Sequence, residues 1–189
     1  MRIFAAMLTL DLTEFPVLTT DRLHLRELTA ADGPALFAMR SDERIMAHIG
    51  RPRATTLQDA EELIATIAKG RTENTGITWA LTLHGDDLLI GTIGYYRLKL
   101  EHHRGEIGYM LAYDHWGKGL MGEALEAAVA CGFERFRFHS IEAITDPRNT
   151  ASNRLLERQG FAREGLFREN YYWNGEFQDS AVWSRLASR

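Results

Sequence analysis

The sequence predicts a mixed α+β fold, with a mostly antiparallel central sheet of about seven strands flanked by about four helices. Three observations predict it: a run of three strand-like segments in the middle of the chain, one strand–helix–strand crossover after it, and a hairpin at the end. A doubly wound fold would instead alternate strands and helices throughout.

The N-terminal part predicts one strand and two helices. Alternating apolar residues from Leu23 to Leu28 are typical of a half-buried strand. The run Thr29–Asp32 looks like a helix start, with Met39 on the inner face of that helix. A second helix is expected over residues 56–71, and a glycine-bounded loop follows it.

The middle of the chain predicts a meander. Strands are expected at 77–83, 88–100 and 105–111. The polar segments between them, 84–87 and 101–104, are short enough for antiparallel hairpins.

A long helix is expected next, because Met121, Leu125 and Val129 repeat at four-residue spacing while Glu123 and Glu126 are expected to face outward.

The C-terminal part predicts a strand at 140–145 and a short helix at 151–158 that Gly160 ends. Two further strands, around 161–172 and 176–187, then form the closing hairpin.

Composition indicates an ordinary globular protein and narrows its partners. The 189 residues are 45% hydrophobic and 25% charged, with a formal net charge of −4. The acidic balance argues against general nucleic-acid binding. No apolar run approaches the roughly 18 residues that a membrane span needs, so no membrane partner is expected either.

Cysteine and histidine usage points to a cytoplasmic protein without a metal site. Cys131 is the only cysteine, so no internal disulfide can form, and its place in a helical pattern is typical of a core residue. The seven histidines show no metal-ligand spacing. The sequence does not fix the oligomeric state and leaves a homodimer open.

Three glycines, Gly117, Gly119 and Gly122, lie between an expected strand and the long helix. Glycines allow a sharp turn and close backbone approach, and a helix start offers unpaired N–H groups and a positive dipole end. These features suit a phosphate or pyrophosphate, with Lys118 as an extra positive charge. On this motif alone, a plain turn and an anion-binding turn stay equally open.

The same glycines also spell G-x-G-x-x-G, the dinucleotide-binding pattern, and Glu142 lies at the expected offset from Gly122. Residues 112–116, however, form a long spacer between Leu111 and the first glycine, and the chain offers one strand–helix–strand unit instead of a series. A nicotinamide or flavin site is therefore disfavoured.

Six motifs in a fixed order resemble the GNAT superfamily of acyl-CoA N-acyltransferases, and within it the RimJ/RimL-like branch of ribosomal-protein N-terminal acetyltransferases. They are Leu18–Arg26, Ile90–Gly94, Glu106–Leu111, Trp116–Gly119, Asn149–Ser152 with Glu157–Phe161, and Asn174–Gly175 with Asp179. Each is weak alone, and their order and spacing carry the resemblance. It covers about residues 17–187, which implies a single domain over 17–189 after an N-terminal extension over 1–16.

The resemblance implies acetyl-CoA as cosubstrate and no metal. The glycine turn would bind the pyrophosphate through backbone amides, the preceding strand would bind the pantetheine arm through its backbone, and an asparagine would contact the arm from the other side. The residues implied are Met110, Leu111, Trp116, Gly117, Lys118, Gly119, Leu120, Met121, Gly122, Asn149 and Ser152. Met121 departs from the family pattern, where a small residue is usual, so the turn is expected either to rearrange or to place this side chain away from the ligand.

Two catalytic residues follow from the same resemblance. Glu106 matches a frequent general base, acting directly or through water, and Ser152 would protonate the departing thiolate. Related ribosomal enzymes can carry a glutamate near Tyr171, which makes Glu169 an alternative base. Without the resemblance, Glu106 is equally a solvated carboxylate, and Asn149 and Ser152 are more simply caps of the short helix.

The function implied is transfer of an acetyl group from acetyl-CoA to a primary amine, such as the N-terminus of a ribosomal protein. Two alternatives stay open: acetylation of a small amine (an aminoglycoside, polyamine or amino acid), and a non-catalytic acyl-CoA-binding regulatory module.

Overall fold

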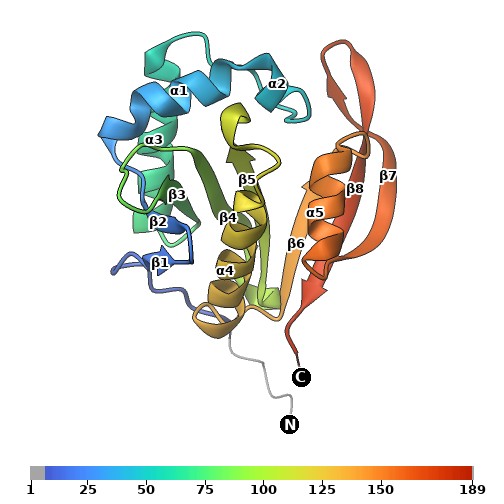
Figure 1. Ribbon diagram of the computed structural model, residues 1–189. Helices are drawn as coiled ribbons and strands as arrows, with labels where there is room; N and C mark the ends of the chain where they lie inside the picture. The colour runs from blue at the N-terminus through green and yellow to red at the C-terminus, as the bar shows by residue number, and fades with distance from the viewer. Residues whose placement is uncertain (1–6, 189) are drawn as a thin grey trace.

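The computed structural model describes residues 7–188 and places eight strands in one sheet, in the order β1-β2-β3-β4-β5-β6-β8-β7 (Figure 1). The strands are β1 (Leu18–Thr19), β2 (Leu23–Glu27), β3 (Ile77–Leu83), β4 (Gly91–Lys99), β5 (Arg104–Leu111), β6 (Ser140–Thr145), β7 (Ala162–Trp173) and β8 (Glu176–Leu186). The helices are α1 (Gly33–Ser41), α2 (Glu43–Met46), α3 (Leu57–Thr72), α4 (Leu120–Glu134) and α5 (Thr150–Arg158), with short 3-10 turns between some elements. Within residues 7–188, β5 and β6 form the one parallel pair. The predicted α+β class and single crossover are confirmed.

The predicted elements agree closely with the observed ones where the pattern is long and regular. The bounds of β3 and β6 are those predicted, and the other predicted strands and helices occur within a few residues of their expected limits. The strand β1 and the helix α2 were not predicted, because segments of two and four residues are too short to show a periodicity.

The helices cover both faces of the sheet. Trp79 and Leu81 of β3 belong to the cluster packed under α4, whereas Ala80 between them belongs to the cluster packed under α1 and α3. This alternation follows from the two-residue period of a strand. The meander is therefore buried on both faces.

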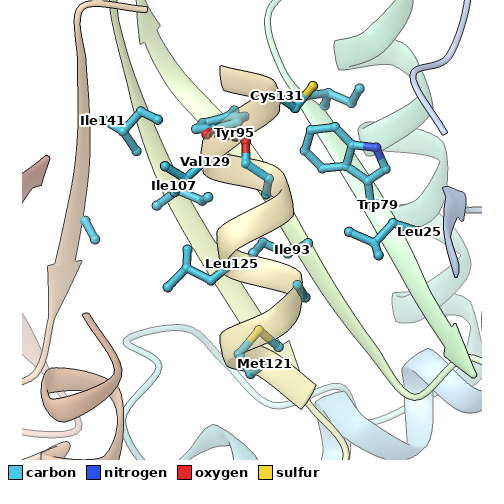
Figure 2. Packing of buried hydrophobic residues seen from close by; sticks show 14 of the residues in the cluster. Leu25, Trp79, Ile93, Tyr95, Ile107, Met121, Leu125, Val129, Cys131 and Ile141 are labelled. Atoms are coloured by element: carbon cyan, nitrogen blue, oxygen red, sulfur yellow. Dashed lines mark hydrogen bonds between the residues drawn. The ribbon is translucent and has the colours of Figure 1, made fainter. Parts of the chain in front are cut away.

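The helix α4 supplies the centre of the larger core (Figure 2). Leu125 and Val129 are buried on it, as predicted, against strands that include Ile93. The Tyr95 hydroxyl donates a hydrogen bond to the Ala128 carbonyl (2.9 Å), which satisfies a polar group inside the core. Cys131 is buried there too, as its position predicted.

The parallel pair β5–β6 separates along its length. The pairing runs only from Arg104↔Ser140 to Glu106↔Glu142, although β5 continues to Leu111 and β6 to Thr145. Beyond the pair Glu106↔Glu142, the backbone groups of β5 and β6 no longer bond to each other. The two cavities described below lie at this separation.

The N-terminal extension predicted over 1–16 packs on the domain as far as it is described. Leu10 and Leu12 are buried in the main core. The Leu12 N–H donates to Asn74 Oδ1 (3.0 Å), and the indole of Trp79 donates to the Pro16 carbonyl. Residues 1–6 of that extension lie outside the described part of the chain. None of the helices in residues 7–188 is long and apolar enough to cross a membrane.

Candidate active site

The glycine turn adopts a backbone shape that needs glycine. Gly117 has φ +73° and Gly119 has φ +77°, both in the left-handed region. Gly119 precedes the first residue of α4, and its carbonyl accepts from the N–H groups of Gly122 (3.1 Å) and Glu123 (3.2 Å). Since a helix start has no earlier carbonyls, the N–H groups of the first two helical residues remain to bind a ligand. The turn has the geometry of an anion site.

Arg22 fixes this turn from the opposite end of the sequence, which the sequence analysis missed. Its guanidinium pairs with Glu123 (2.7 Å) and donates to the Lys118 carbonyl (2.9 Å), and the Thr20 hydroxyl donates to the same carboxylate. Burial opposes the charge of Glu123, but these hydrogen bonds outweigh it and lower its pKa. Glu123, which was expected to face outward, lies outside the hydrophobic core but is only 18% exposed, because Arg22 holds it in an ion pair. The Leu18–Arg26 motif was the signal available.

A cavity of about 500 Å³ lies between the turn, β5 and α5. Most of the residues expected to bind the cofactor line it: Met110, Leu111, Trp116, Gly117, Gly119, Leu120, Met121, Gly122, Asn149 and Ser152. Lys118 is the exception among them, since it is exposed outside this lining. Arg44 of α2 also lines the cavity and stacks on Tyr113, with 3.8 Å between the guanidinium carbon and the ring centroid.

Only every second residue of β5 directs its backbone N–H and C=O groups toward the open edge of the strand. The Ala112 N–H donates to the Ile90 carbonyl (2.8 Å), so this residue directs its backbone toward β4. Because backbone direction alternates along a strand, Met110 also faces β4, whereas Tyr109 and Leu111 face the separation from β6. The Leu111 carbonyl there accepts from the Trp116 indole (2.8 Å). Of the two residues predicted to offer backbone groups, Leu111 is oriented to do so, and Met110 lies one residue out of phase.

Met121 packs into the core instead of filling the turn. Its side chain is 8% exposed and lies with Leu125 in the α4 cluster (Figure 2). Met121 is thus a core residue that also lines the first cavity, and its placement relative to a bound ligand stays a prediction.

The start of α5 brings a hydroxyl pair to the middle of the cleft. Asn149 caps the helix, its Oδ1 accepting from the Ser152 N–H (3.0 Å), so the capping role left open by the sequence is present. Ser152 Oγ lies 2.7 Å from the Tyr109 hydroxyl of β5. Burial raises the pKa of Tyr109 to about 12, so this phenol stays protonated. Tyr109 was not singled out as a side chain from the sequence.

A second cavity, of about 490 Å³, continues from the first. The two share five lining residues: His48, Ile49, Tyr109, Asn149 and Ser152. Glu106 lines the second cavity and is only 6% exposed, so it is not the solvated carboxylate of the plainer interpretation. Both of its oxygens accept from Arg97 Nη1, at 2.8 and 3.1 Å.

His48 and Asp146 meet where the two cavities join. His48 Nδ1 lies 2.9 Å from Asp146 Oδ2, and Arg148 binds the same carboxylate through both Nε and Nη2. Burial opposes the charge of Asp146, but the bonds from Arg148 and His48 outweigh it and lower its pKa. No local sequence pattern links the two residues, since they are 98 positions apart.

The alternative base, Glu169, lies outside both cavities. It is exposed, has φ +50°, and its N–H donates to Asp179 Oδ1 (2.8 Å). Its neighbour Tyr171 does line the second cavity.

Comparisons with known proteins agree with this geometry. The profile of the acetyltransferase (GNAT) domain matches residues 22–162. The uncharacterized N-acetyltransferase YoaA of Bacillus subtilis is 37% identical over 175 residues, covering 93% of this chain and 99% of that protein. The ribosomal-protein-serine acetyltransferase of Escherichia coli is 33% identical over 104 residues, covering 53% of this chain and 56% of that protein.

Among solved structures, RimL, a ribosomal L7/L12 alpha-N-protein acetyltransferase in complex with coenzyme A, superposes with a TM-score of 0.83 at 18% identity, over 90% of this chain and 98% of that one. That likeness concerns the fold. Together with the profile match and the full-length relative, the glycine turn and the separated strands identify the chain: it belongs to the GNAT family of acetyltransferases.

Proposed function

We propose that this N-acetyltransferase takes its acetyl group from acetyl-CoA bound in the first cavity and passes it to a protein N-terminal amine bound in the second. The observation that carries the proposal is the junction of the two cavities at Tyr109 and Ser152. A thioester and an amine that enter from opposite sides meet there. Positioning of this kind supplies a large share of the acceleration in bimolecular transfer.

The first cavity fits acetyl-CoA in shape and charge. A Cβ atom added at Gly117 would meet nothing within 4 Å, so the backbone there is open to a close ligand. The helix start provides N–H groups for a pyrophosphate, and the guanidinium of Arg22 and the ammonium of Lys118 add positive charge beside the turn. The Tyr109 and Leu111 edge of β5 supplies backbone groups for an amide-containing arm.

Glu106 and Ser152 are the proposed catalytic residues, Glu106 on the side of the acceptor amine and Ser152 on the side of the leaving sulfur. The Glu106 carboxylate lies in the acceptor cavity, where it attracts the ammonium form of the amine. Ser152 is placed to donate a proton to the sulfur as the carbon–sulfur bond breaks, and the Tyr109 hydroxyl can return that proton to Ser152.

The charges of the second cavity favour a peptide over a polycation. Arg51 and Arg97 line it together with Glu106 and Asp146, and Arg148, which lines the first cavity, binds Asp146 from outside it. Both carboxylates are already paired with arginines. An aminoglycoside or a polyamine would bring several positive charges to a site whose two carboxylates already have guanidinium partners, whereas a peptide brings one amine and several carbonyls.

A protein acceptor also suits the neighbouring hairpin. Asn170 and Tyr171 of β7 line the second cavity, and the adjacent Tyr172 and Phe177 are exposed and stacked edge to face (centroids 5.1 Å apart). Exposed aromatic side chains are frequent at protein contacts. Since a relative acts on ribosomal-protein serine by its name, a ribosomal-protein N-terminus is the acceptor we favour, which would place the activity in the cytoplasm.

The test is an acceptor panel followed by thiol release and mass spectrometry. Peptides that begin with Ser or Ala, spermidine, an aminoglycoside and free amino acids are each incubated with acetyl-CoA. Preferred acetylation of a peptide α-amine supports the proposal, and preferred acetylation of a small amine overturns its acceptor. Binding of acetyl-CoA without turnover on any amine would establish the regulatory alternative.

A further inference from the structure

We propose that His48, oriented by Asp146, is the general base that accepts the proton from the acceptor amine. The inference rests on the proposed function and adds to it a residue and a proton path. It is carried by the position of His48 at the junction of the two cavities and by its bond to a buried carboxylate.

The bond to Asp146 sets which nitrogen of the imidazole is free. Asp146 is 4% exposed and ionised, so it accepts a hydrogen from Nδ1 across 2.9 Å. A neutral imidazole with its proton on Nδ1 carries a lone pair on Nε2. Within residues 7–188 no hydrogen bond occupies that second nitrogen, and the His48 side chain is 35% exposed in the region of the two cavities.

Arg148 keeps this pair suited to accept a proton. Its guanidinium binds both oxygens of Asp146 (3.0 Å from Nε to Oδ1, 2.9 Å from Nη2 to Oδ2). The carboxylate is thereby shared between Arg148 and the imidazole, which Asp146 orients through Nδ1. The charged form that appears after proton transfer is still stabilised by the same carboxylate.

Glu106 is less available for the same step. Both of its oxygens are engaged by Arg97, and the residue is buried between β4 and β6. A proton bound there would neutralise the carboxylate and so cost it the ion pair with Arg97. The two residues thus divide the work: Glu106 attracts the ammonium group, and His48 takes its proton.

The proton path balances. The ammonium group gives one proton to His48 Nε2, and the neutral amine then forms the carbon–nitrogen bond with the acetyl carbonyl carbon. As the carbon–sulfur bond breaks, the electron pair leaves with sulfur, which receives a proton from Ser152. The nitrogen then loses a second proton, which replaces the one that the Ser152–Tyr109 pair gave to sulfur. His48 releases to solvent the proton that it took from the ammonium group. The products are the amide, the free thiol and one proton.

Several charged or titratable groups face the region and contribute to any pH dependence. They are Asp146 and Arg148 after β6, Arg44 in α2, Arg51 after α2, Tyr96 and Arg97 in β4, Glu106 and Tyr109 in β5, His115 after β5, and Tyr171 in β7. Replacing His48 alone, with these groups intact, isolates its contribution.

The kinetic test compares His48→Gln with Glu106→Gln and with His102→Gln as a matched control. Gln can keep a bond to Asp146 but is not basic, and His102 is an exposed histidine (side chain 62% exposed) that lines neither cavity. With a Ser- or Ala-initiated peptide at pH 7, His48→Gln should lower kcat by about 10²–10⁴-fold. The deficit should shrink as pH rises, because the amine then arrives already neutral. Acetyl-CoA affinity and the melting temperature should stay close to wild type, and His102→Gln should be unaffected.

Rescue separates a base from a structural residue. His48→Ala should regain activity with added imidazole, while Glu106→Gln should not respond. If His48→Gln keeps wild-type kcat and pH profile, or if Glu106→Gln alone abolishes the pH-dependent step, His48 is not the base.

A spectroscopic test is independent of turnover and so distinguishes failure of this inference from failure of the proposed function. Nitrogen-15 NMR of the protein with coenzyme A, with the His48 signal assigned by its loss in His48→Gln, should show the Nδ1–H tautomer. A proton fixed on Nε2 would overturn the inference even in an active enzyme. Absence of acetyl transfer in the wild type would instead count against the proposed function.

Discussion

The hydroxyl groups of Tyr109 and Ser152 lie 2.7 Å apart and connect β5 to the first turn of α5 across the site where β5 and β6 have separated. Neither strand pairs with the other at this level, so the hydroxyl pair is a direct polar link between the two sides of the cleft. Both residues line both cavities, which is the reason we propose that this pair donates a proton to the thioester sulfur.

Removing either hydroxyl tests that role. Ser152→Ala should lower kcat by about 10²–10⁴-fold with acetyl-CoA affinity nearly unchanged, since only the donor to sulfur is lost. Tyr109→Phe should have a smaller effect of the same kind. Because burial raises the pKa of Tyr109 to about 12, its phenol remains protonated below that pH, and the wild-type rate should show no titration from this residue between pH 6 and 10. Steady-state kinetics across that range checks both points, and an equal loss of cofactor binding in Ser152→Ala would argue for a purely structural hydroxyl.

The glycine turn can be tested against a glycine of the same shape elsewhere. Gly119→Val and Gly85→Val both place a β-branched residue at φ near +78° (+77° and +79°), so both should lose about 1–3 kcal/mol of folding stability. Gly119→Val should in addition lose acetyl-CoA binding by about tenfold or more, because its side chain obstructs close approach to the helix start. Thermal shift with and without acetyl-CoA measures both quantities. Equal ligand-induced shifts in the two variants would show that this turn does not hold the pyrophosphate.

Glu106→Gln should act mainly on the acceptor. The variant keeps the size of the side chain but removes the charge that attracts an ammonium group, and a charge-assisted hydrogen bond contributes about 1.5–3 kcal/mol. We expect KM for the amine to rise by roughly 10–10²-fold, with acetyl-CoA affinity unaltered. The exposed Arg97 loses its partner but remains hydrated, since its side chain is 60% exposed. A fall confined to kcat, with pH dependence lost, would transfer the role of base from His48 to Glu106.

The closeness of β3 and β4 predicts a difference between two glycine-to-alanine changes. A Cβ at Gly94 would lie 2.4 Å from the Ile77 carbonyl oxygen, whereas one at Gly165 would meet nothing within 4 Å. Gly94→Ala should therefore destabilise the fold by about 1–3 kcal/mol, a drop of several degrees in Tm, while Gly165→Ala should stay near wild type. Calorimetry measures the Tm of the two variants. Similar Tm values would mean that β3 and β4 can move apart at Gly94 without loss of folding stability.

The sequence determined the elements and their order. The strand bounds of β3 and β6, the buried stripe of α4 and the glycine turn all follow from local periodicity and from backbone shapes that glycine allows. Such features depend on neighbours within a few positions, and the ordered motifs were then enough to identify the family. The fate of Met121 could only be left as two outcomes, because core packing decides it.

Tertiary structure decided which charged and polar groups meet. Arg22 and Glu123 are 101 positions apart, His48 and Asp146 98, and Tyr109 and Ser152 43. No local pattern links such residues: their contacts depend on the register of the sheet and on the point where β5 and β6 part. Pairing of β5 with β4 brings Arg97 to the buried Glu106, and the folded chain places His48 at the junction of the two cavities. The burial of a charged side chain and the identity of its partner depend on how the strands assemble. The chemistry of the site is therefore decided by the tertiary structure.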